Sequence, residues 1–277
     1  MLCYSTGSLP DAFTFSEIAN LLSPSPFKGV ELVVTADMLK RADESRYWRA
    51  IRAEFEAGDL CVRNVHMGAP FLMGPIPHQP GLSSLDPMLR SRKAEAAEKC
   101  LAIAVSLGSP NVTLTTGLPD SELAMDRHVE SLKSVIASLI KSKPQGMDFM
   151  IEQEPEHVIR SSEQLLDLAE TFLGDVFINF DVGHSQVLGE DIGSSLLELA
   201  PYLRNIHLED IKDRVHAHKL YGDGDVDFTG IFRSLREIKY QGDFTPDLYP
   251  FKDDFVNAMD ASIRFLRAHE VLVTPVT

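Results

Sequence analysis

Residues 176–207 read VFINFDVGHSQVLGEDIGSSLLELAPYLRNIH. The runs Val176–Asp181 and Leu203–His207 are short, apolar and bounded by polar or turn-forming residues, which predicts two strands. A helix is predicted between them near Ser194–Leu199. Strands that alternate with a helix form parallel βαβ units, so this stretch predicts a parallel sheet.

The same alternation continues along the whole chain. The other six predicted strands are Met1–Ser5, Gly29–Val34, Leu60–His66, Asn111–Thr115, Met147–Glu152 and Gly242–Asp247. The other predicted helices lie near Thr14–Leu22, Glu44–Ala57, Ser91–Leu107, Ser121–Ser142, Ser162–Phe172, Phe228–Ile238 and Asp253–His269. Eight strand–helix units in 277 residues predict an α/β fold, a single (βα)8 TIM barrel over residues 1–277. The alternative is an open doubly wound sheet, but the turn Ser5–Pro10 lacks its glycine-rich fingerprint.

Composition restricts the classes of function. The net charge of -15 disfavours binding to nucleic acid and to anionic membranes. No run is apolar and long enough to span a membrane, and no charged segment followed by an apolar one resembles a secretion signal. Cys3, Cys61 and Cys100 are too few for a disulfide framework and are expected to be buried thiols. These features predict a cytoplasmic protein and argue against nucleic acid as a partner.

Polar side chains end consecutive predicted strands. The fifth strand ends in Glu152, the sixth in Asp181, the seventh in His207 and the eighth in Asp247. In a barrel these ends meet at one mouth, where unpaired carboxylates would repel one another and lose hydration. A divalent cation resolves that conflict. The donors are oxygen and nitrogen without thiolate, which suits Mn, Mg, Co, Fe or Zn.

Two long connections follow strands and therefore lie at the same mouth: Met67–Leu89 and Glu209–Asp227. Long loops in compact domains are usually functional or disordered. The first carries Phe71, Leu72 and Met73, which are expected to form an apolar lid. The second carries His216 and His218, so that five histidines fall on this face: His66, His184, His207, His216 and His218.

Five segments, in their order and strand positions, resemble the xylose isomerase-like barrel superfamily over nearly the whole chain. They are Ile151–Pro155, Asp181–His184, Ile206–Asp210, His218–Phe228 and Tyr240–Leu248. The superfamily includes ketose 3-epimerases, hydroxypyruvate isomerase-like and inosose dehydratase-like enzymes, and endonuclease IV. The epimerase branch implies one metal, with these four ligands: Glu152, Asp181, His207 and Asp247. There Glu152 and Asp247 would also move protons, while His184 and Arg214 would bind substrate.

The endonuclease branch uses three zinc ions and more ligands. The residues that match its pattern are His66, Glu152, Asp181, His184, His207, His218 and Asp247. His216 stands where that branch has an aspartate, and Leu114–Gly117 replaces its histidine after the fourth strand. A second metal or a substrate contact therefore remains open for His66, His184, His216 and His218.

Three further assignments stay open. Asp247 replaces the usual glutamate and has a shorter reach. Glu154 points to the same side of an extended strand as Glu152 and is an alternative ligand, although the apolar run ends at Glu152. Glu31, on the second strand, is expected either to bind a substrate hydroxyl or to be a salt-bridged acid.

The resemblance implies a metal-dependent sugar or polyol isomerase/epimerase that works by carboxylate proton transfer and an enediolate intermediate. One alternative is a multinuclear-metal phosphoester hydrolase of the endonuclease IV type. Another is a sugar-binding barrel without turnover. The expected partner is a small sugar or polyol. The oligomeric state stays open, although barrels of this type often pair into homo-oligomers.

Overall fold

Eight parallel strands form the centre of the molecule. The computed structural model describes residues 1–271, so residues 272–277 of the predicted domain lie outside the described residues. The strands follow one another in the order β1-β2-β3-β4-β5-β6-β7-β10. Their bounds are Cys3–Ser5, Gly29–Val33, Cys61–His66, Asn111–Thr115, Asp148–Glu152, Val176–Asp181, Leu203–Leu208 and Asp243–Pro246. A parallel bridge between Leu2 and Phe244 brings β10 beside β1 and completes the ring, which confirms the predicted (βα)8 barrel.

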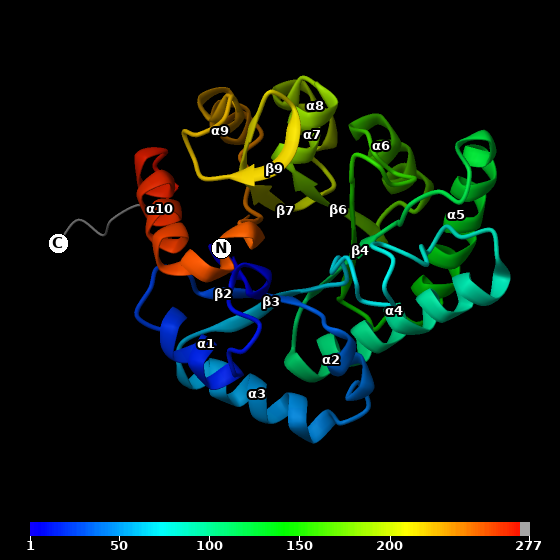
Figure 1. Cartoon of the computed structure of the whole chain (residues 1–277), viewed down its shortest axis with the longest axis horizontal. Coiled ribbons are helices and arrows are strands. Elements are labelled where there is room, and N and C mark those ends of the chain that lie inside the picture. The colour runs from blue at the N-terminus through cyan, green and yellow to red at the C-terminus, as the bar shows by residue number, and fades with distance from the viewer. Residues whose placement is uncertain (272–277) are drawn as a thin grey trace.

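Helices surround this ring (Figure 1). The helices α1 to α10 span Phe15–Leu22, Ala36–Lys40, Ser45–Ala57, Pro87–Leu107, Met125–Ser142, Ser162–Thr171, Val182–Leu188, Ile192–Leu199, Phe228–Glu237 and Phe255–Ala268. Three short 3-10 turns, η1 to η3, span Thr6–Ser8, Glu122–Ala124 and Tyr249–Asp254. No helix within residues 1–271 is long and apolar enough to cross a membrane.

Local sequence explains where several helices begin and end. Thr14 and Glu17 form a reciprocal capping box at the start of α1. Asp86 accepts hydrogen bonds from the first backbone N–H groups of α4, and Pro87 occupies its first turn. Helix α4 therefore begins four residues before the predicted Ser91. It ends at Gly108, whose φ of 72° is the left-handed conformation that glycine adopts most readily.

Burial follows from the layered architecture. All six residues of β6 are buried, since its side chains face either the barrel interior or the surrounding helices. Phe15, Trp48 and Phe55 pack edge to face and join α1 to α3. Cys3 and Cys100 are buried as expected, whereas Cys61 is half-buried.

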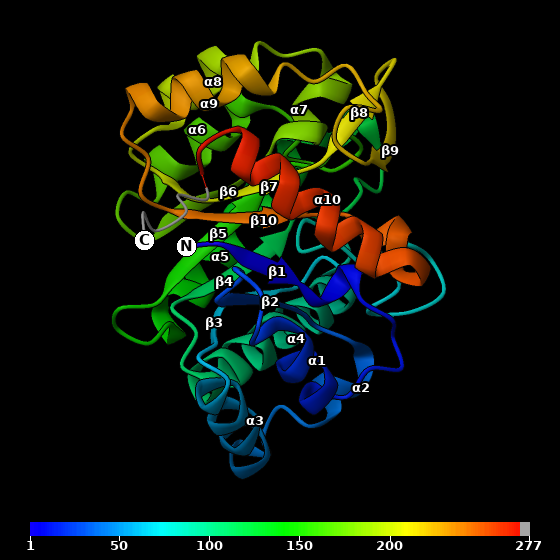
Figure 2. The same cartoon turned by 90° about the vertical axis from the view of Figure 1, so that its left-hand side faces the viewer.

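The long connection Glu209–Asp227 contains an antiparallel hairpin that the sequence did not predict. Its strands are β8, Asp210–Lys212, and β9, Val215–Lys219. Its two turn residues, Asp213 and Arg214, both have positive φ, a conformation usually signalled by asparagine or glycine. In Figure 2 the chain starts on the left, and the hairpin lies on the right, at the end where the barrel strands finish.

Candidate metal centre at the barrel mouth

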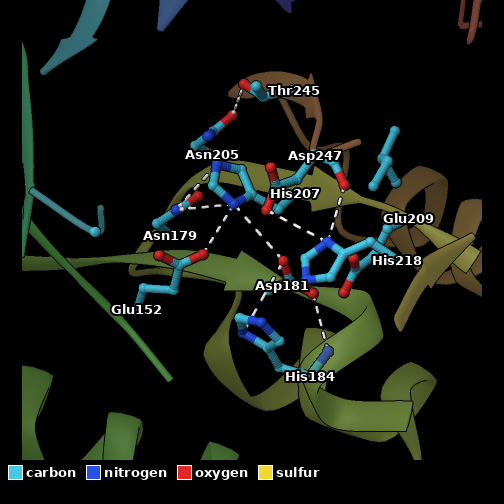
Figure 3. Close-up of polar contacts among 12 residues, drawn as sticks. Glu152, Asn179, Asp181, His184, Asn205, His207, Glu209, His218, Thr245 and Asp247 are labelled. Atoms are coloured by element: carbon cyan, nitrogen blue, oxygen red, sulfur yellow. Dashed lines mark hydrogen bonds and ion pairs between the residues drawn. The ribbon is translucent and has the colours of Figure 1, made fainter. Parts of the chain in front are cut away.

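Parallel register brings the predicted ligands together. Asp181 at the end of β6 is paired with His207 on β7, and His207 is paired with Thr245 on β10. His207 Nδ1 lies 2.8 Å from Glu152 Oε1 and 3.6 Å from Asp181 Oδ2 (Figure 3). Asp247 follows β10 directly, and it shares a group with Asp181 and His207 whose ligand atoms all lie within 4.8 Å of one another. The other three predicted ligands thus converge on His207.

The hydrogen bonds of the Asp181 carboxylate indicate whether a cation would fit among these four residues. Its Oδ1 accepts the backbone N–H of His184 at 2.9 Å, whereas its Oδ2 is buried and receives no hydrogen bond from residues 1–271. Such an orphaned buried oxygen costs free energy unless something satisfies it. The surrounding donors are carboxylate oxygens and imidazole nitrogens, which suit a divalent cation. The donor set therefore fits the predicted metal, and ligation by these four residues stays a prediction.

Glu31 fixes the orientation of His207. His207 Nε2 lies 2.9 Å from Glu31 Oε2, and that oxygen also accepts a hydrogen bond from Asn64 Nδ2 at 2.8 Å. Burial would raise the pKa of Glu31, but the charge of His207 and their hydrogen bond outweigh it and lower that pKa to about 2. For His207, burial would lower the pKa, and attraction to Glu31 and Glu152 raises it well above its ordinary value. Glu31 is therefore ion-paired and leaves Nδ1 facing Glu152 and Asp181.

A second imidazole holds the other oxygen of Glu152. His66 Nδ1 accepts the backbone N–H of Gly68 at 3.1 Å, so a neutral ring carries its proton on Nε2. That nitrogen lies 2.7 Å from Glu152 Oε2. Burial would raise the pKa of Glu152, but the charges of His207 and His66 lower it well below its ordinary value. Glu152 is thus held as an ionised carboxylate.

Glu154 occupies a different place from Glu152. Its Oε2 lies 3.8 Å from His184 Nε2, and within residues 1–271 it forms a ligand-type group with His78 and His157 rather than with Asp181 and His207. The geometry therefore favours Glu152 as the ligand. Burial raises the pKa of Glu154 and of Asp247 to about 7.

A second cluster of ligand-type atoms lies beside the first. It consists of His184, Glu209, His216 and His218, with ligand atoms within 4.8 Å of one another. His216 Nε2 is 2.9 Å from His218 Nε2. Glu209 is fully buried and contacts His218 Nδ1. Among the described residues 1–271, nothing donates a hydrogen bond to its carboxylate beyond that ion-pair contact. Sequence reasoning missed Glu209, although it follows Asn205 and His207 at the two-residue spacing of one strand face.

A cavity of about 180 Å³ opens at the barrel mouth. The acids and histidines described above that line it include Glu31, His66, Glu152, Glu154, His184, His207, His216, His218 and Asp247. The connection after β3 lines it with Gly68, Ala69, Pro70 and His78. The expected lid of Phe71, Leu72 and Met73 does not line it, because Leu72 packs into the core and Phe71 is 63% exposed.

Arg214 is also placed away from the cavity. It is exposed at the tip of the β8–β9 hairpin, and its guanidinium packs against Gly189 at the end of α7. Arg214 is therefore not among the residues that line the cavity, because the hairpin turn directs the side chain outward, and its contact with a substrate stays a prediction.

Comparisons with known proteins agree with this architecture. The family model described as xylose isomerase-like TIM barrel matches residues 21–269. An inosose dehydratase from Clostridium perfringens is 30% identical over 121 residues, which are 36% of this chain and 40% of that protein. A putative L-ribulose-5-phosphate 3-epimerase, SgbU, from Escherichia coli is 24% identical over 253 residues, covering 82% of this chain and 80% of that protein.

Solved structures share the fold at low sequence identity. A D-tagatose 3-epimerase-like protein superposes with a TM-score of 0.77 at 18% identity, over 97% of this chain and 98% of that one. The IOLI protein, solved with a bound zinc atom, has a TM-score of 0.80 at 14% identity, over 99% of each chain. The named sequence relatives are sugar-modifying enzymes. With a family model that covers most of its length, the chain belongs to the xylose isomerase-like TIM barrel family.

Proposed function

We propose that this chain is a divalent-metal-dependent enzyme that isomerises or epimerises a sugar or polyol. The observation that carries the proposal is the convergence of Glu152, Asp181 and Asp247 on His207, with one buried oxygen of Asp181 left without a donor in the described part of the chain. Glu152, Asp181, His207 and Asp247 would hold the cation. When bound, it would polarise the substrate carbonyl as a Lewis acid. The sugar-modifying relatives and the zinc atom of the IOLI protein support this assignment.

The side chains of the chain would carry the proton transfers. Glu152, ionised and oriented by His66, would remove the proton from the carbon next to the carbonyl and leave an enediolate. Asp247, the other acid beside His207 in the cavity, would return a proton. Return to the opposite face of the same carbon gives epimerisation, and return to the neighbouring carbon gives isomerisation. His184 Nδ1 donates to the carbonyl of Gln153 at 2.7 Å, which orients the ring towards a substrate oxygen in the cavity.

The second candidate is a phosphoester hydrolase with more than one metal. It is favoured by the cluster of His184, Glu209, His216 and His218, whose buried carboxylate lacks hydrogen-bond donors among the residues that the structure describes. Two features weigh against it. Leu114–Gly117 offers no imidazole after β4, and the net charge of -15 repels polyphosphate substrates.

One experiment separates the two candidates. The chain is stripped of metal, reloaded with Mn²⁺, and its metal content is measured by elemental analysis. The loaded protein is then incubated in D2O with D-fructose, D-tagatose or an inosose. The isomerase proposal expects one metal per chain and NMR-detected deuterium at the carbon next to the carbonyl. Two metals per chain together with cleavage of a phosphodiester probe, and no deuterium exchange, would instead establish the hydrolase.

A further inference from the structure

A larger groove lies next to the polar cavity, with a volume of about 550 Å³. The two share five lining residues: Gly7, Val33, Ala69, Pro70 and Lys252. The wall that the two spaces share includes Gly7 and Ala69, which carry little or no side chain. Because the two spaces adjoin along this wall, a single elongated molecule is the simplest occupant of both.

The groove differs from the cavity in its chemistry. The aromatic and thioether side chains that line it are Phe13, Phe15, Met38, Tyr47 and Phe71. They come from the connection after β1, from α1, α2 and α3, and from the long connection after β3. Phe71 is 63% exposed although it stands beside this apolar wall. An apolar occupant would remove this surface from water, which is favourable in proportion to the area covered.

The charges at the groove argue against an anionic occupant. Within residues 1–271, Lys252 is the one lysine or arginine that lines either space. Its Nζ lies 2.5 Å from Asp11 Oδ1, and Asp11 lines the groove as well. A phosphate group would have to displace that pairing and would face the acidic cavity. The groove therefore suits an uncharged group.

We propose that the substrate is a two-part molecule, an uncharged polyhydroxy ketone with an apolar, planar substituent at the end remote from its carbonyl. The ketone end lies in the cavity at Glu152, and the substituent lies in the groove against Phe71 and Tyr47. The ketone end rests on the proposed function. The groove and its preference for an apolar substituent stand on the lining residues alone.

The test compares two ligands that differ only in the substituent. The dissociation constants of 6-O-benzyl-D-fructose and 6-O-methyl-D-fructose are measured by calorimetry with the Mn²⁺-loaded chain. Covering the phenyl ring should tighten binding of the benzyl compound about tenfold relative to the methyl compound. In Phe71→Ala this ratio should fall at least about threefold. The matched control is Ile76→Ala, which changes a side chain 61% exposed on the same connection but outside both spaces, and it should keep the full ratio.

Because the affinities are measured without turnover, the groove proposal can fail or succeed independently of the proposed reaction. A tenfold preference that depends on Phe71, in a protein without deuterium exchange, would support the groove and refute the isomerase. Equal affinities for the two ligands, or a ratio that Phe71→Ala leaves unchanged, would overturn the groove proposal. Sedimentation of the parent protein and of Phe71→Ala tests whether a second copy of the chain fills the groove instead. A dimer that Phe71→Ala dissociates, without a ligand preference, would assign the groove to a second copy of the chain.

Discussion

At the scale of single residues, Glu152 is held between two imidazoles, His66 at 2.7 Å and His207 at 2.8 Å. We expect Glu152→Gln to lower kcat by about 10²- to 10⁴-fold, because an amide cannot accept the proton. Far-UV circular dichroism should show an intact fold, since the amide oxygen can still accept from His66. Glu156→Gln, an exposed acid four residues away, is the control and should keep its activity. Near-normal turnover in Glu152→Gln would move the base to Glu154.

Glu31 acts through another residue, because it contacts His207 Nε2 while Nδ1 faces the candidate metal ligands. Glu31→Gln should weaken Mn²⁺ binding about 10- to 100-fold, the usual effect of removing a carboxylate that orients a metal-binding histidine. Competition with a chelator measures the affinity. Asp37→Asn, an exposed acid on α2, should leave it unchanged. Glu31 would have no positioning role if its variant bound Mn²⁺ as tightly as the parent.

At the scale of elements, Asp210 holds the connection that contains the β8–β9 hairpin. The backbone N–H groups that its buried carboxylate accepts belong to Ile211, Gly222, Gly224 and Val226. In Asp210→Asn, either orientation of the amide places an NH2 group against two donors. The free energy of unfolding, measured in urea, should fall by about 2–3 kcal/mol. Asp225→Asn removes the charge from the acceptor of one exposed hydrogen bond, which the amide oxygen can still accept, and should cost below about 1 kcal/mol. Equal losses in the two variants would contradict this role of Asp210.

Strand β9 carries His216 and His218 over the cavity. For a single-metal isomerase, replacing both with alanine should leave the metal content at one per chain and raise KM by about five- to tenfold, since hydrogen bonds to substrate are lost. Elemental analysis measures the metal content and steady-state kinetics measure KM. The single variant His216→Ala is the comparison and should raise KM less than the double variant. Loss of a second equivalent of metal would favour the hydrolase. Unchanged metal content and kinetics would exclude both functions for these histidines.

At the scale of the whole molecule, the cation would join three strands through Glu152, Asp181 and His207. Through Asp247 it would also bind the segment that follows β10. Removing it with a chelator should lower Tm by about 5 °C or more, because a ligand at 100 times its Kd stabilises the folded state by about 2.7 kcal/mol. Asp181→Asn should respond less to chelation, since it lacks one ligand. If chelation leaves the Tm of the parent protein unchanged, these strands share no tightly bound cation.

Much of the barrel and of its mouth follows from local sequence. The apolar runs with strand-type residues located all eight barrel strands, because strand and helix periodicities are properties of neighbouring residues. The same runs showed which polar residues stand at the strand ends, and parallel strands bring those ends to one side. Glu152, Asp181 and His207 could therefore be picked out as neighbours from the sequence.

The tertiary structure decided which of these side chains contact one another. Glu31 and His207 are 176 positions apart, and only closure of the ring brings them to 2.9 Å. The hairpin that carries His216 depends on Asp213 and Arg214 in a conformation that their side chains do not signal. The cluster around Glu209 and the aromatic groove are likewise formed by residues from separate elements of the chain. Periodicity sets the face on which a residue lies, whereas its partners depend on register and loop packing, which no short stretch of sequence contains.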